Sequence, residues 1–224
     1  MDKFKTFKFI NLFNQLESSN LKIISRFIII MNPIGKNSIR RKVLIGFVGL
    51  PGSGKSTVLK AIEDLGVIVT MGDIIRNETR KESIEPTDEN LGKVAQKLRD
   101  EFGPDILAEK CVVLIKNLEA EVVFIDGLRS IAEVKIFRSS WKFPIVAIIV
   151  DDNVRFERLS KRARPDDPKN LENLRERDQR EISYGLNEVI NSANYKVNNN
   201  LSVKEVQKIA RNLILNIINN YYTK

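Results

Sequence analysis

A glycine-rich loop, placed between a short apolar run and a helical segment, narrows the possible folds of this chain to very few. Gly49–Ser56 reads Gly-Leu-Pro-Gly-Ser-Gly-Lys-Ser and matches G-x-x-x-x-G-K-[ST] without deviation. The run 43–48 before it predicts a buried strand, and residues 55–65 after it have helical spacing. A strand, this loop and a helix in that order begin a P-loop α/β domain.

Each residue type in the loop has a physical role in holding phosphate. Glycines let backbone N–H groups converge on phosphate oxygens, and the following helix adds its positive N-terminal end. Lys55 is expected to reach the β- and γ-phosphates, and Ser56 to offer a hydroxyl to Mg²⁺. The alternative is a glycine-rich connection that binds nothing. We expect ATP to be bound by Gly49, Leu50, Pro51, Gly52, Ser53, Gly54, Lys55, Ser56 and Thr57.

The rest of the chain alternates apolar runs with helical patterns. Strands are expected at 43–48, 67–71, 122–125, 145–150 and 195–197, the second of them buried. Helices are expected to begin after Met71 and at 87, 104, 130, 152, 170 and 202, with Thr87 as a cap. This alternation predicts a three-layer α/β/α fold, in which a five-stranded parallel sheet is covered by helices on both faces.

A second apolar strand ends in a carboxylate. Val122-Val123-Phe124-Ile125 leads into Asp126, which would stand at the carboxyl edge of the sheet beside Ser56. There it could hold Mg²⁺ directly or through water. The alternative is that Asp126 caps a helix or belongs to a turn.

The composition excludes several kinds of site. The chain has no histidine, and so lacks the commonest general base and zinc ligand. Its single cysteine, Cys111, excludes an internal disulfide and a thiolate metal cluster. A reducing compartment fits this composition, and we predict a cytoplasmic protein. Acid–base and metal chemistry must come from carboxylates, hydroxyls and backbone groups.

The positive charge is concentrated at the N-terminus. Residues 1–42 carry nine Lys or Arg against Asp2 and Glu17, which is +7 of the net +8. The near-neutral remainder does not resemble a general nucleic-acid binder. The extension, whose apolar piece 27–31 is too short to span a bilayer, is expected to be loosely ordered or a leader upstream of Met31. A membrane-surface or partner-binding arm is the alternative.

Two further segments carry a family resemblance. Met71-Gly72-Asp73-Ile74-Ile75-Arg76 and Asp126-Gly127-Leu128-Arg129 resemble segments of adenylate kinase and related nucleoside monophosphate kinases. Residues 192–197 resemble the segment before the last helix of dephospho-coenzyme A kinases. Across 43–203, the chain is most similar to an uncharacterised archaeal family of adenylate-kinase-related P-loop nucleotide-binding proteins. The runs that carry this similarity are 86–90, 126–130 and 177–181.

The resemblance implies roles for individual residues. Arg76 and Arg129 would hold the phosphate of the acceptor, and Asp73 would orient the attacking oxygen or accept its proton. The resemblance places lid arginines, which neutralise the transferred group, at Arg155, Arg158 and Arg162, with Arg162 as the catalytic one. The alternatives are salt-bridged surface arginines and a capping role for Asp73. Of the cluster Arg175, Arg177 and Arg180, only one is expected to reach the phosphates.

Three departures leave the acceptor open. The turn at 128–129 is one residue shorter than in adenylate kinases, the adenine-reading glutamine has no counterpart in 130–133, and the lid at about 162–170 is short. The resemblance therefore implies phosphoryl transfer to a small phosphorylated molecule without naming it. Residues 72–117 are expected to form a mobile acceptor-binding subdomain of the domain 43–224. The sequence predicts no oligomeric state.

The leading hypothesis is thus an ATP- and Mg²⁺-dependent kinase acting on a nucleotide-like small molecule. An ATP-binding regulatory switch without transfer is the second hypothesis. A guanine-specific switch is disfavoured because the chain lacks Asn-Lys-x-Asp. A nucleic-acid end-processing kinase is the third, and the near-neutral domain argues against it.

Overall fold

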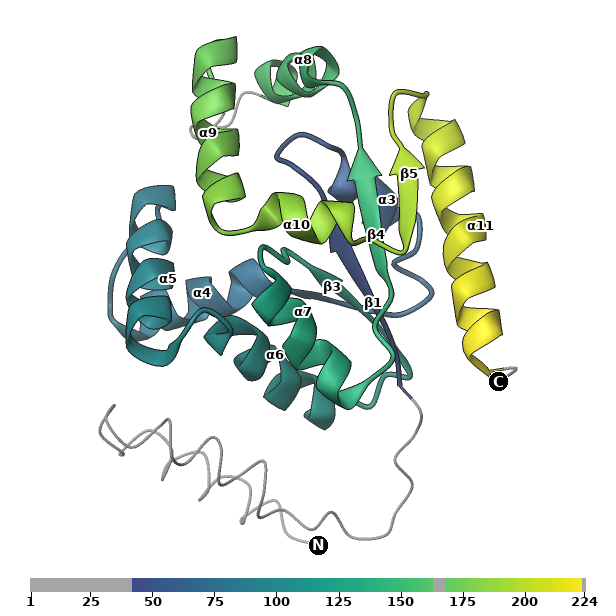
Figure 1. The fold of residues 1–224 in the computed structure, drawn as a ribbon, viewed down its shortest axis with the longest axis horizontal. Coiled ribbons are helices and arrows are strands. Elements are labelled where there is room, and N and C mark those ends of the chain that lie inside the picture. The colour runs from purple at the N-terminus through teal and green to yellow at the C-terminus, as the bar shows by residue number, and fades with distance from the viewer. Residues whose placement is uncertain (1–41, 163–167, 223–224) are drawn as a thin grey trace, which may run out of the picture. The chain divides into compact units, whose positions relative to one another are not determined.

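A five-stranded parallel sheet forms the centre of the fold (Figure 1). The structure is a computed structural model that describes residues 42–162 and 168–222, so the extension before Lys42 and most of the expected lid lie outside the described residues. The strands are β1 (Val43–Val48), β2 (Val67–Thr70), β3 (Val122–Asp126), β4 (Ile145–Ile149) and β5 (Tyr195–Asn198). Their spatial order is β2-β3-β1-β4-β5, with every pairing parallel.

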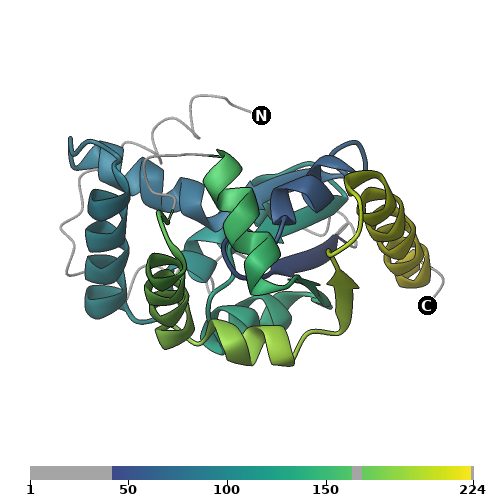
Figure 2. The same ribbon diagram turned by 90° about the horizontal axis from the view of Figure 1, so that it is seen from above.

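Helices cover both faces of this sheet, which confirms the expected fold class. They are α3 (Lys55–Lys60), α4 (Met71–Lys81), α5 (Asp88–Phe102), α6 (Ile106–Asn117), α7 (Ile131–Ser140), α8 (Asp152–Arg162), α9 (Leu171–Ser183), α10 (Leu186–Asn191) and α11 (Val203–Tyr222). In Figure 2, α5 and α11 lie at opposite ends of the described domain. No helix among the described residues is long and apolar enough to cross a bilayer.

The central strand β1 divides its side chains between two hydrophobic cores, because successive residues of a strand point to opposite faces. Val43, Ile45 and Phe47 pack into one core with α3 and α11. Leu44 and Val48 pack into the other, with α4, α5, α6, α7 and α10. A strand buried on both faces reads as a continuous apolar run, and this is why the sequence predicts β1 with its correct bounds.

Some element predictions are wrong. The second strand was expected to be buried, but β2 is at the edge of the sheet and Val67 is 40% exposed. The first helix ends at Lys60 and continues only as turns, although its apolar spacing runs to Leu65. The helix expected at 170–184 is present as α9, but the separate helix α10 that follows it was not predicted. Gly185 separates the two, with a φ of 97° that favours glycine.

The helices of the expected acceptor subdomain, 72–117, pack on one another, and α6 also packs on α7. The side chain of Thr87 accepts a hydrogen bond from the backbone N–H of Asn90, which confirms Thr87 as the cap of α5. The division of the chain into an acceptor subdomain and a lid stays a prediction.

Candidate functional site

The P-loop joins the carboxyl end of β1 to the N-terminus of α3, and its glycines are required by its shape. Gly52 and Gly54 have φ values of 79° and 88°, in the region where other residues are strained. A Cβ atom at Gly49 would stand 2.6 Å from the hydroxyl oxygen of Ser53. Glycine at these positions lets the backbone take the tight turns by which N–H groups can converge on phosphate oxygens.

The Lys55 side chain reaches back to the first residue of the loop. Its Nζ donates a hydrogen bond to the carbonyl oxygen of Gly49 at 2.7 Å. Burial lowers the pKa of the Lys55 ammonium, and the negative charges of Asp126 and Glu181 oppose that shift. An ammonium group whose charged form is disfavoured by burial gains when phosphate oxygens bind it.

Asp126 lies where the sequence places it, at the end of β3. In the sheet register it is opposite Phe47 of β1, two residues before Gly49. Its Oδ1 is buried and has no hydrogen-bond partner among the described residues. Burial raises the pKa of the Asp126 carboxyl, while Lys55 lowers it. Its unused oxygen and the exposed hydroxyl-bearing residue Ser56 are the kind of oxygen donors that Mg²⁺ takes alongside phosphate.

No group of three or more acidic or cysteine side chains in 42–162 and 168–222 is arranged to hold a metal ion. A Mg²⁺ ion with one carboxylate, one hydroxyl and otherwise water and phosphate needs no such cage. The described residues therefore fit the expected Mg²⁺ site at Ser56 and Asp126, and exclude a protein-only metal cluster in this part of the chain.

Arg155, expected as a lid arginine, instead binds the backbone of the P-loop at Pro51. Its side chain is 1% exposed, and its Nη1 donates to the carbonyl oxygen of Pro51 at 3.0 Å and to Asp178 Oδ1 at 2.9 Å. Its Nη2 is bound by Asp178 Oδ2 and, at 2.8 Å, by Asp152 Oδ1. A guanidinium with these bonds is fixed inside the protein, and the prediction that it faces the transferred phosphate is wrong.

A buried asparagine that sequence reasoning missed holds the other side of the loop. Asn199 is 2% exposed, and its Nδ2 donates to the carbonyl oxygen of Ser53 at 2.6 Å. Arg158, also expected in the lid, donates to the backbone oxygen of Asn199 at 2.8 Å. Asn199 follows β5 and lies 146 residues from Ser53 in sequence, and no local pattern could have indicated the contact.

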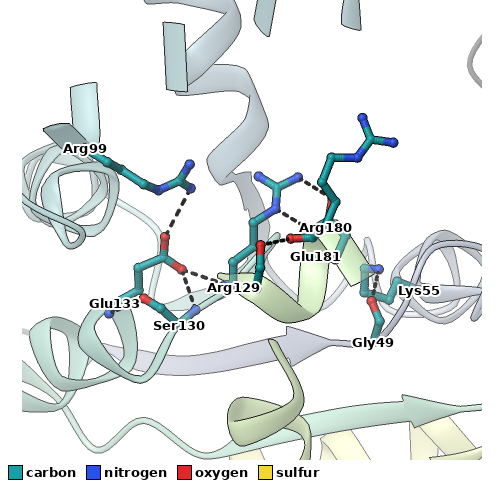
Figure 3. Close-up of polar contacts among 9 residues, drawn as sticks. Gly49, Lys55, Arg99, Arg129, Ser130, Glu133, Arg180 and Glu181 are labelled. Carbon is teal, nitrogen blue, oxygen red and sulfur yellow. Dashed lines mark hydrogen bonds and ion pairs between the residues drawn. The ribbon is translucent and has the colours of Figure 1, made fainter. Parts of the chain in front are cut away.

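Arg129 is close to Lys55, as expected, but a carboxylate holds it. Its Nε donates to Glu181 Oε2 at 2.7 Å, and its Nη2 to Glu181 Oε1 at 3.3 Å (Figure 3). Charge interactions connect Lys55 with Asp126, Arg129, Glu181 and Arg177. The structure thus gathers three predicted site residues, Lys55, Asp126 and Arg129, at the carboxyl edge of the sheet.

The helix α9 contacts both Arg129 and Arg155, the arginine that binds the P-loop. Glu181 binds Arg129, and Asp178, three residues before it, binds Arg155 under the P-loop. The sequence analysis considered only the arginines of this helix as site residues, and it missed both acidic residues. Alternating charge on a helix gives no sign of which members are buried.

Asp73 and Arg76 are paired with each other. The Arg76 Nη1–Asp73 Oδ1 distance is 2.5 Å, and the side chains are 45% and 63% exposed. The cap position of α4 is Thr70, so Asp73 does not cap the helix. Because Thr70 pairs with Asp126 in the sheet and α4 starts at the next residue, Asp73 lies near the same edge of the sheet. Arg162 ends α8 with an exposed side chain.

Comparison with known proteins shows the family to which this chain belongs. A UPF0200 protein of Methanosarcina mazei is 39% identical over 178 residues, which are 78% of this chain and 95% of that protein. The chain belongs to the UPF0200 family. Residues 48–175 match a family model described as an AAA domain; this is more than half of the chain, which therefore belongs to that family too. The resemblance to a P-loop nucleotide-binding family is confirmed.

Solved structures share the fold of this UPF0200 protein. The structure of TT1252 from Thermus thermophilus has a TM-score of 0.53 at 16% identity, and covers 79% of this chain and 98% of its own. Shikimate kinase from Bacteroides thetaiotaomicron has a TM-score of 0.52 at 15% identity, and covers 77% and 98%. At these identities the likeness shows the fold alone, an α/β domain built on a parallel sheet.

Proposed function

We propose that this UPF0200 protein is a kinase that transfers the γ-phosphate of ATP to a nucleotide or nucleotide-like small molecule. The observation that carries the proposal is that Lys55, Asp126 and Arg129 lie together at the carboxyl edge of the sheet, beside the P-loop. Phosphoryl transfer needs positioning and positive charge rather than a covalent catalyst. The absence of histidine is therefore no obstacle to this chemistry.

In this proposal the P-loop residues 49–57 bind the phosphates of ATP, with Lys55 at the β- and γ-phosphates. Ser56 and Asp126 would hold Mg²⁺, which would supply charge neutralisation at the phosphates. Arg129 binds the acceptor, with Asp73 and Arg76 as further substrate contacts and Arg162 in the lid. The bond from γ-phosphorus to an acceptor oxygen forms as the bond to the bridging oxygen breaks, and ADP leaves with that oxygen.

The test is ATP-to-ADP turnover with Mg²⁺ in the presence of AMP, CMP, UMP, GMP or dephospho-coenzyme A. At least one acceptor is expected to raise ADP formation at least about tenfold above the acceptor-free rate, because a bound acceptor replaces water as nucleophile. Tight ATP binding without stimulation by any acceptor would contradict the kinase proposal and favour an ATP-binding regulatory switch.

Replacing Glu181 with Gln is expected to strengthen binding of an anionic acceptor about fivefold. Glu181 competes with the acceptor for the donor edge of Arg129 formed by Nε and Nη2, and a neutral amide competes less than a carboxylate. The measurement is the KM of the acceptor found in the turnover test. Glu172→Gln, at an exposed position of the same helix, is the matched control and should leave this KM unchanged. Weaker acceptor binding in Glu181→Gln would show that Glu181 orients Arg129 for the acceptor.

A further inference from the structure

A cavity of about 850 Å³ lies at the edge of the sheet where the strands begin. Its lining comes from the end of α7, the segment 141–144 before β4, residues 194–195 at the start of β5 and the last turns of α11. Because the strands are parallel and the P-loop follows the carboxyl end of β1, the cavity and the P-loop lie at opposite edges of the sheet. Figure 1 shows α11 ending on the side where β4 and β5 begin. Small-molecule sites commonly measure about 300 to 1,000 Å³, so the cavity can hold a small ligand apart from the proposed transfer site.

One cation of this lining is positioned but not neutralised. Arg138 is exposed near the end of α7, and its Nε and Nη2 donate to the carbonyl oxygen of Phe143 and to Asn194 Oδ1, each at 3.4 Å. Both bonds are longer than the distance of about 2.7–3.2 Å typical of N–H···O bonds, and both acceptors are uncharged. No carboxylate in residues 42–162 and 168–222 forms an ion pair with Arg138. The guanidinium therefore keeps its charge and most of its donors for a ligand.

The other charged side chain of the lining is also positive. Lys142 is exposed, and its Nζ lies over the ring of Tyr221, 5.8 Å from the ring centroid. A cation–π contact holds an ammonium group in place without cancelling its charge. The described residues that line the cavity include no Asp or Glu, so the cavity presents net positive charge. Charge of this sign favours an anionic ligand.

Aromatic side chains add flat surfaces to the same lining. Trp141 is half-buried against the hydrophobic core, and Tyr195 is 39% exposed at the start of β5. The buried side chains of Phe143 and Ile217 contribute further apolar atoms. Rings of Trp and Tyr stack on nucleobases of any kind, because every base has a π face. The cavity thus combines positive charge with rings on which a planar group can stack.

We propose that this cavity is a second nucleotide site, separate from the P-loop, and that it binds a free nucleotide. The phosphate binds to Arg138 and Lys142, because guanidinium and ammonium groups are the usual phosphate ligands of proteins. The base stacks on the ring of Trp141 or Tyr195. Two cations match one phosphate group, whereas binding of a polynucleotide relies on many such contacts. The inference goes beyond the proposed function, because no residue of the lining belongs to the transfer site.

The test is a titration of the full chain with AMP, followed by the fluorescence of Trp141. This residue is the single tryptophan of the chain and lines the cavity, so a base stacked beside it should quench the signal. Adenosine and ribose 5-phosphate are the matched ligands without the phosphate and without the base, and their affinities are measured by competition with AMP. AMP is expected to bind at least about tenfold more tightly than either, because only AMP gains both the charged hydrogen bonds and the stacking.

Substitutions at the two cations test the phosphate end of the site. Arg138→Met and Lys142→Met should each weaken AMP binding at least about fivefold, because each removes a charged donor to phosphate. Both side chains are exposed, so both variants should fold. Lys135→Met is the matched control, at an exposed position of α7 outside the cavity, and should leave AMP binding unchanged.

Two variants of the transfer site separate this cavity from the P-loop. Lys55→Ala and Arg129→Met should leave the AMP-dependent quenching of Trp141 unchanged, because both residues lie at the opposite edge of the sheet. Loss of the quenching in either variant would overturn the inference, since Trp141 would then report the transfer site. Unchanged AMP binding in Arg138→Met and Lys142→Met would overturn it too. Equal affinities for AMP and ribose 5-phosphate would overturn the base stacking. Binding of an adenylate octamer more than about a hundredfold tighter than AMP would overturn the free-nucleotide assignment, because it would require phosphate contacts outside the cavity.

Discussion

Lys55→Ala is expected to lower ATP-dependent phosphoryl transfer by at least about 10²-fold, the typical loss when a donor to a transition-state oxygen is removed. The Lys55 ammonium lies inside the P-loop, at a position where burial already lowers its pKa. No second lysine is available within the loop residues 49–57. The measurement is kcat for ADP formation with the acceptor found in the turnover test.

The fold should survive this substitution. Lys55→Ala removes one hydrogen bond to Gly49 together with a charge whose burial is unfavourable, so the free energy of unfolding should change by no more than about 1 kcal/mol. Lys60→Ala is the matched control, because Lys60 ends the same helix with an exposed side chain. It should keep wild-type kcat. Wild-type turnover in Lys55→Ala would remove the assignment of the P-loop as the ATP site.

Much of the fold could be predicted because the signals are local. The loop 49–56 has a fixed spacing, and β1 is an apolar run bounded by a lysine and a glycine. The edge position of β2 could not be predicted, because an apolar run of four or five residues looks alike in a central strand and at an edge. The end of α3 at Lys60 also depends on packing, which the periodicity of 55–65 does not report.

The candidate site divides in the same way. Lys55 and Asp126 could be predicted because each stands at or shortly after the end of an apolar strand, and the structure brings the two together. Glu181 lies 52 residues from Arg129, a separation at which no sequence spacing carries information.

Arg155→Met is expected to lower the free energy of unfolding by about 3 kcal/mol, because it leaves a buried carboxylate without its cation. Asp178 is 8% exposed, and both of its oxygens are bound by Arg155. The same guanidinium holds the carbonyl oxygen of Pro51, so its loss should also loosen the P-loop and raise the KM for ATP. Chemical denaturation of both proteins measures the first effect, and ATP-dependent turnover measures the second.

Arg211→Met separates this effect from the loss of an ordinary surface ion pair. Arg211 makes two short bonds to Asp64, at 2.6 and 2.7 Å, but the two side chains are 38% and 59% exposed. Solvent screens such a pair, so its loss should cost no more than about 1 kcal/mol and leave the KM for ATP unchanged. Equal destabilisation by both substitutions would mean that Asp178 gains water when Arg155 is removed. An unchanged KM for ATP in Arg155→Met would show that Asn199 alone is enough to hold the loop, since its Nδ2 binds Ser53 from the other side.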